Sequence, residues 1–209
     1  MWALVQAGNV IRVFTRPTAF SIGDINHPAN VFSVWSEAEL NAISIYLIVE
    51  DRTNVKDEKY YINTNVTHTY NAGTGKVDAT WGSPTAKGLD DVNWTQEQVD
   101  NGHSNGGTTS DVATEGLKTI KKRNIDKECD YLLQDSDWMA VKAFEENGDV
   151  ESGWKTGRAS VRTKCNSMQA QIDGAADVDA LAALYAYVNT GTVENPVIER
   201  PLGEFPVKE

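Results

Sequence analysis

Histidine, cysteine and carboxylate side chains carry most enzyme and metal chemistry, and in this chain the three histidines lie far apart. His27 precedes a proline in a turn, His68 lies in a β-rich run, and His103 lies in a Gly-rich stretch. None of them has a Cys, His or carboxylate at the spacing of a metal-ligand pair. The sequence therefore predicts no bound metal and no other cofactor.

A short acidic run is the other candidate for chemistry. Glu145, Glu146, Asp149 and Glu151 could attract calcium, but they lack the alternating oxygen ligands of an EF-hand loop. We therefore interpret the run as a solvated loop between helices. The chain also contains no G-x-S-x-G elbow, P-loop or G-x-G-x-x-G sequence. We expect a non-enzymatic protein without catalytic residues.

The charge of the chain argues against nucleic acid as a partner. The formal net charge is -11, whereas binding a phosphate backbone requires a basic patch. The basic cluster 121–123 is followed by Asp126 and Glu128, and such a mixed run is typical of one solvated helix face. We expect no nucleic-acid binding.

Hydropathy and cysteine content limit the environment of the chain. Hydrophobic residues make up 40% of it, and no stretch approaches the roughly 18 consecutive apolar residues of a membrane span. The first residues show neither the basic flank nor the cleavage site of a secretion signal. We therefore expect Cys129 and Cys165 to be buried, reduced thiols.

Residues 1–100 predict a β-rich module that contains one short helix. Alternating and β-branched runs, interrupted by Gly and Asn turns, are typical of hairpins. The expected elements are hairpins with turns at Gly8-Asn9 and at 71–75, a buried strand at 45–49, and a helix from about 37 to 44 that starts with a capping box of Ser36 and Glu39.

The second half of the chain changes to a helical period, so we predict an α+β fold. A Gly/Asn/Ser linker at 101–110 leads to a helical module at 111–190. We expect a long helix after Asp111, a short one capped by Ser136 or Asp137, a third over 152–172, and a fourth capped by Asp177 that includes Val188. Residues 191–209 contain Pro196, Pro201 and Pro206, which predicts an extended C-terminal arm.

The helical residues carry a resemblance to a known family. The relevant residues are Arg123, Leu132-Leu133, Ser136-Asp137-Trp138, Trp154, Gly157-Arg158 and Val161-Arg162. This order resembles the segment R…LL…(S/T)DW…W…YR…LR of bacteriophage tail-fibre assembly and tail assembly chaperone proteins. It departs from that segment at Gly157, where an aromatic residue is usual, and in a longer acidic spacer between the tryptophans. The opening MWALVQAGNVIRVFTRP, followed by HPANVF, also resembles the N-terminal β module of tail-fibre-associated proteins.

The resemblance implies a non-enzymatic phage tail protein. Such a chain would be a structural or adaptor component of the tail tip, baseplate or tail fibre, made in the host cytoplasm and located in the virion tail. Its partners would be other tail or fibre proteins, in a homo-oligomer or a symmetric assembly. One alternative is a tail-fibre assembly chaperone that is absent from the mature virion. Another is a receptor- or glycan-binding tail-tip protein, for which Tyr70, Trp81 and Trp94 are the candidate aromatics.

Two interpretations of Trp138 remain open. Its ring can anchor a core between Leu132-Leu133 and Trp154, which is the interpretation that we prefer, or it can face a partner. Likewise, the apolar side chains of the arm can dock onto a neighbouring subunit or cover the helices of their own chain. The candidate partner-binding residues are Trp138, Trp154, Arg158, Arg162, Val197, Leu202 and Phe205.

Overall fold

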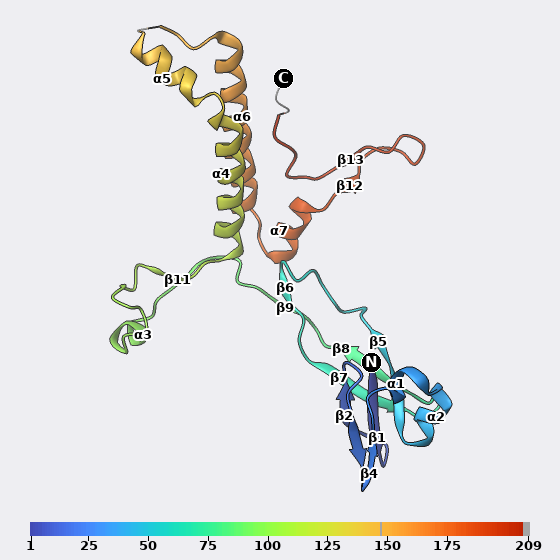
Figure 1. Ribbon diagram of the computed structural model, residues 1–209. Coiled ribbons are helices and arrows are strands. Elements are labelled where there is room, and N and C mark those ends of the chain that lie inside the picture. The colour runs from blue at the N-terminus through green and yellow to red at the C-terminus, as the bar shows by residue number, and fades with distance from the viewer. Residues whose placement is uncertain (147, 207–209) are drawn as a thin grey trace. The chain divides into compact units, whose positions relative to one another are not determined.

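The computed structural model describes residues 1–146 and 148–206 of the chain (Figure 1). The chain divides into two compact units, Met1–Thr85 and Ala86–Glu209. The first is rich in strands and the second contains the long helices, so the predicted α+β class is confirmed. The stretch 101–110, which the sequence predicts as a linker, lies inside the second unit and not at the division.

A five-stranded sheet in the order β2-β1-β5-β8-β7 forms the first unit. Its strands are β1 (Trp2–Gln6), β2 (Asn9–Phe14), β5 (Ile45–Asp51), β7 (Val66–Asn71) and β8 (Lys76–Trp81). Both predicted hairpins, β1–β2 and β7–β8, are antiparallel pairs, and the predicted strand β5 is antiparallel to β1 and parallel to β8. The turn of the first hairpin is formed by Ala7 and Gly8, one residue before the predicted Gly8-Asn9, and Asn9 is the first residue of β2. Ala7 and Gly8 have φ of 49° and 79°, the positive values that a type I′ turn requires.

Curvature of this sheet creates the first of two apolar cores. The edge strands β2 and β7 contact each other, so the sheet curls and encloses one of its faces. The enclosed side chains are small or β-branched, which allows the strands to curl tightly. They are Ala3, Val5, Ile48, Val77 and Ala79, with the half-buried Val10, Val13, Tyr46, Val66 and Tyr70 around them.

Short elements cover the outer face of the sheet and form the second core. They are β3 (Phe20–Ile22), β4 (Ile25–His27), α1 (Val31–Val34) and α2 (Glu37–Ala42). The rings of Phe14, Phe20 and Phe32 pack there with centroids 5.0 to 5.4 Å apart. The predicted capping box is present, since the Ser36 amide donates to Glu39 Oε2 at 2.8 Å and the Glu39 amide donates to Ser36 Oγ at 3.3 Å.

Smaller strand pairs lie at and after the division between the units. β6 (Tyr61–Ile62) pairs with β9 (Thr85–Ala86), and β10 (Val92–Asn93) pairs with β11 (Val112–Thr114). The β10–β11 pair closes a loop that contains α3 (Gln96–Asp100) and the stretch 101–110. That stretch is therefore a tied loop within the second unit and does not connect two modules.

Four helices form the main part of the second unit. They are α4 (Leu117–Gln134), α5 (Asp137–Glu145), α6 (Ser152–Asp173) and α7 (Val178–Tyr185). Figure 1 shows α4 and α6 side by side, and their shared core contains Ile125, Cys129, Cys165, Met168 and Ile172. Both cysteines are buried, as predicted, and both thiols are free. Within the described residues, no helix combines the length and the apolar character needed to cross a bilayer.

Two of the predicted helix limits agree with the structure and two differ from it. Helix α6 spans the predicted residues, and Asp177 caps α7 by accepting from the Ala180 amide at 2.7 Å. Helix α4 begins at Leu117 and not after Asp111, because Val112–Thr114 forms strand β11. Val188, predicted on the last helix, lies instead in β12 (Val188–Asn189).

The C-terminal segment is folded onto its own unit, whereas the sequence predicts an extended arm. Strand β12 pairs with β13 (Ile198–Glu199) to form a hairpin. Beyond it, the side chain of Leu202 is fully buried, at 0% exposure. The Leu202 amide donates to the Leu184 carbonyl at 3.0 Å, and Lys164 Nζ donates to the Leu202 carbonyl at 3.1 Å. Residues 207–209 of the predicted arm lie outside the described residues.

Candidate functional site

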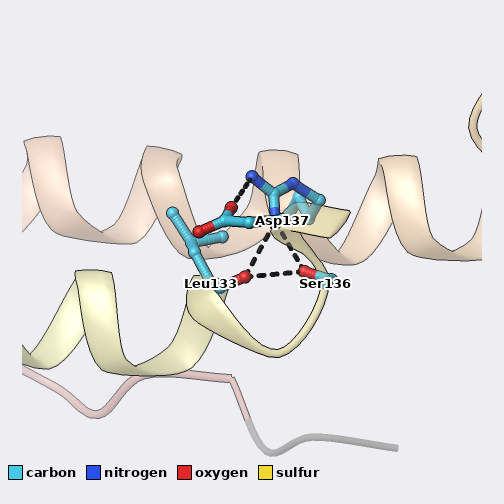
Figure 2. Close-up of polar contacts among 4 residues, drawn as sticks. Leu133, Ser136 and Asp137 are labelled. Atoms are coloured by element: carbon cyan, nitrogen blue, oxygen red, sulfur yellow. Dashed lines mark hydrogen bonds and ion pairs between the residues drawn. The ribbon is translucent and has the colours of Figure 1, made fainter. Parts of the chain in front are cut away.

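Four of the residues that carry the sequence resemblance meet where α4 ends and α5 begins, whereas Arg123 pairs with Glu115 at the start of α4. Figure 2 shows Leu133, Ser136 and Asp137 at this turn, and the Arg158 guanidinium of α6 binds all three. Its Nη1 donates to the Leu133 carbonyl at 2.9 Å and to Ser136 Oγ at 2.5 Å, and its Nη2 donates to Asp137 Oδ1 at 2.7 Å. We call this set of four residues, Leu133, Ser136, Asp137 and Arg158, the helix joint.

The end of α4 explains why the joint needs a cation. The last carbonyls of a helix have no partner within that helix and must find one elsewhere. The Leu133 carbonyl finds it in Arg158, in the Ser136 amide at 3.0 Å and in the Ser136 hydroxyl at 2.9 Å. The prediction that Ser136 caps α5 with its side chain is wrong, because its hydroxyl donates backwards to α4 instead. The Ser136 side chain is only 2% exposed, so the joint is closed to water at this point.

Trp138 does not anchor a core, and this interpretation of the sequence is wrong. Its side chain is 57% exposed on α5. Val141 and Phe144 are exposed on the same helix, and Phe144 is 85% exposed. Spacings of three residues place Trp138, Val141 and Phe144 on one side of a helix. We call these three residues the α5 face.

A groove lies beside the joint, along the first turns of α6. It has a volume of about 700 Å³. Its walls include Leu132 and Leu133 of α4, Trp154 and Val161 of α6, and Pro206 of the C-terminal segment. Trp154 therefore lines a concave surface, and a partner side chain could enter beside it.

The remaining candidate partner-binding residues fall into different environments. Arg162 is exposed on α6, and Val197 is exposed just before β13. Phe205 is half-buried in the C-terminal segment. Leu202 is not accessible to a partner, contrary to the prediction, because its side chain is enclosed by its own unit. The structure thus assigns Arg158 to the joint and leaves Trp138, Trp154, Arg162 and Val197 accessible.

Sequence reasoning missed Val141 and Phe144 as surface residues. They follow Trp138 by three and six residues, so the sequence predicts that they share the apolar side of the short helix with it. The available signal was Met139 and Ala143, which lie on the opposite side of α5 and are the residues that the structure half-buries. A helix that is apolar on two sides can bury only one of them when it has a single neighbour.

The titratable groups give no sign of catalysis or metal binding. Within residues 1–146 and 148–206, no three His, Cys, Asp or Glu side chains are grouped closely enough to hold a metal ion. Burial, together with a hydrogen bond to Cys129 and the charge of Asp126, raises the pKa of Cys165 to about 12. A thiol with such a pKa is a poor nucleophile at neutral pH. Its place between α4 and α6 is that of a core residue.

Among the aromatics suggested for glycan binding, Tyr70 packs into the core of the first unit. Its ring centroid lies 4.6 Å from that of Tyr46. Trp81 and Trp94 belong to different units.

Comparisons with known proteins give no further information on this site. No protein-family model matches the chain, and no curated protein or solved structure is significantly similar to it. The site is therefore described by its geometry alone, which is a bonded helix joint beside a groove and an exposed apolar face on α5.

Proposed function

We propose that the chain is a non-enzymatic bacteriophage tail protein, an adaptor of the tail tip, baseplate or tail fibre that joins neighbouring virion proteins. The observation that carries this proposal is the helix joint. Leu133, Ser136-Asp137 and Arg158 are residues of the sequence segment that resembles phage tail proteins, and they bind one another across 21 to 25 residues of sequence. This contact gives those residues of the resemblance a shared structural role.

The two units support an adaptor role. The first unit has two apolar cores of its own, and the second has a helical core and displays the α5 face. Exposed aromatic side chains are enriched where proteins bind one another. A chain with two self-contained units can hold one neighbour with each.

A fibre-assembly chaperone is the second candidate, and the exposure of the α5 face favours it specifically. A chaperone binds immature fibre chains reversibly and must therefore keep an apolar surface accessible before and after the encounter. The adaptor and the chaperone differ in whether the chain remains in the finished particle.

Deletion of the gene from the phage that carries it tests the common part of the proposal. We expect lysates that contain heads and incomplete or fibreless tails by negative-stain electron microscopy, with normal particles restored by a plasmid copy. Normal, fully infectious particles from the deletion phage would contradict a role in the tail.

A further inference from the structure

We infer that the α5 face binds a basic, amphipathic segment of a partner protein. The inference deepens the proposed function, because it rests on the chain acting as a protein-binding adaptor or chaperone and adds the chemistry of the partner. It follows from the apolar exposure of α5, from the charge around it, and from the mismatch of that charge with a second copy of the chain.

The apolar exposure is large for so short a helix. Trp138, Val141 and Phe144 are all more than half exposed, while Met139 and Ala143 on the other side are half-buried against their own unit. Two aromatic rings and a valine expose on the order of 300 Å² together. Contiguous apolar patches of a few hundred Å² on a protein surface mark interaction sites.

The segment that carries this face has an excess of acidic side chains. Residues 135–151 contain six carboxylates and a single lysine. Lys142 lies 3.9 Å from Glu146, and two cations of α6, Lys155 and Arg158, pair with Asp149 and Asp137. Six carboxylates therefore face three cations, and the region keeps a net negative charge. An apolar centre with a negative rim is complementary to a segment in which Lys or Arg residues flank apolar side chains.

The same charge argues against a second copy of the chain as the occupant. A symmetric dimer through α5 would bring the two acidic rims together, because an isologous interface pairs each patch with itself. Like charges facing each other across an interface oppose association. The occupant is therefore a different protein with basic flanks.

The probe is a fluorescein-labelled helical peptide of 15 residues, with leucine and tryptophan on one side and lysine on the other. The control peptide has the same sequence with each lysine replaced by glutamate. Binding to the full chain is measured by fluorescence anisotropy at 50 and 500 mM NaCl. We expect the lysine peptide to bind at least tenfold more tightly than the glutamate peptide, and this difference to shrink at the higher salt concentration. Equal binding of the two peptides would overturn the inference.

Two double variants locate the site. Trp138→Ser with Phe144→Ser should weaken binding of the lysine peptide at least tenfold. The control, Ile25→Ser with Val34→Ser, removes exposed apolar side chains from the first unit and should leave the dissociation constant unchanged. Far-UV circular dichroism checks that both variants remain folded. Equal affinities of the two variants for the lysine peptide would overturn the inference. A second contradicting result would be a wild-type dimer in sedimentation velocity that is lost only in the α5 variant.

Failure of this inference is distinguishable from failure of the proposed function. Peptide binding is measured without phage, so a chain that binds the lysine peptide through α5 supports the inference even when deletion of its gene leaves particles normal. Conversely, defective particles together with the absence of selective peptide binding would refute the inference and leave the proposed tail role standing.

Discussion

The guanidinium of Arg158 lies where two helix ends meet, and its charge suits this position. The end of α4 presents unpaired carbonyls with partial negative charge, which a cation stabilises. Asp137 lies in the first turn of α5, where a carboxylate is favourable, and it pairs with Arg158 at 2.7 Å. The Arg158 side chain therefore caps the C-terminus of α4 and pairs with Asp137, and through both contacts it fixes the direction in which α5 leaves the turn.

Replacing this arginine should destabilise the second unit. We expect Arg158→Ala to lower the free energy of unfolding by about 2–3 kcal/mol, because charge-assisted hydrogen bonds to partly buried groups are lost. The matched control is Arg162→Ala, one turn further along α6 and exposed, with an expected effect within about 0.5 kcal/mol. Urea denaturation followed at 222 nm measures both. Similar losses in the two variants would show that Arg158 has no special role.

Cys165 gives a pH dependence of stability in the alkaline range. Burial raises its pKa to about 12 from an ordinary value of 9.0, so the folded protein favours the neutral thiol. Stability from this group is fully present below the pKa of the unfolded chain and is lost as pH rises towards the folded value. The affected window therefore runs from about pH 9 to pH 12.

We expect Cys165→Ala to reduce this alkaline dependence. Wild type should lose more unfolding free energy between pH 8 and pH 10.5 than the variant does, since the thiol that must stay protonated has been removed. Denaturation curves at the two pH values give the comparison, and it is the difference between the proteins that counts, because lysines and tyrosines titrate in both. Parallel losses in the two proteins would contradict the assignment.

Among the elements, α4 depends on a segment that precedes it by about 25 residues. Its first residue is Leu117, and the amides of Leu117 and Lys118 donate to the carbonyls of Gly88 and Leu89 at 2.9 and 3.0 Å. The Gly116 amide donates to Asp91 Oδ1 at 2.6 Å. The bond from the Gly116 amide, with a further one from the Thr119 hydroxyl, holds the pKa of Asp91 below its usual range. The start of α4 is thus capped from a distance and not by a local side chain.

This close approach requires glycine at position 116. A Cβ there would lie 2.5 Å from the Asp90 carbonyl oxygen and 2.6 Å from that of Leu89. Gly116→Ala should therefore cost about 2–3 kcal/mol, because backbone atoms must shift. Gly157, inside α6, has open space around its Cβ position, so Gly157→Ala should stabilise by about 0.5–1 kcal/mol. Thermal unfolding that gave both variants the same sign of change would contradict this account of the cap.

The C-terminal segment should contribute to the stability of its own unit. Leu202→Ala removes a fully buried side chain and should cost about 2–4 kcal/mol of unfolding free energy. Val193→Ala, in the exposed loop between β12 and β13, should change it by less than about 0.5 kcal/mol. Equal stability of the two variants in urea would instead favour the extended arm that the prolines suggest.

The elements that the sequence predicts well are those with local signals. The β1–β2 hairpin, the capping box of Ser36 and Glu39, and the cap by Asp177 depend on neighbouring residues and are all present, with the hairpin turn one residue earlier than predicted. The cap of α4 by Asp91 and the burial of Leu202 join residues far apart in sequence, and no periodicity encodes them. The prediction that Trp138 is buried is wrong because α5 carries apolar residues on two sides, and its sequence does not determine which side packs against the protein.

At the scale of the whole molecule, the sequence predicts the charge of the chain more directly than it predicts the function of the chain. The net charge of -11 is unevenly distributed, and residues 135–151 are part of the excess. This placement gives the α5 face its acidic rim. The identity of the neighbours depends on the surfaces of other proteins, which the sequence of one chain does not encode.

The most direct test of the proposed tail role is quantitative mass spectrometry of gradient-purified particles from the phage that carries the gene. Peptides of this chain are measured against those of the major tail proteins across the particle peak. An adaptor predicts that the chain follows the particles at a fixed whole-number ratio to its neighbours and resists a high-salt wash. Its absence from purified particles would contradict the adaptor role, and presence in the lysate alone, with defective tails on gene deletion, would assign the chain to assembly.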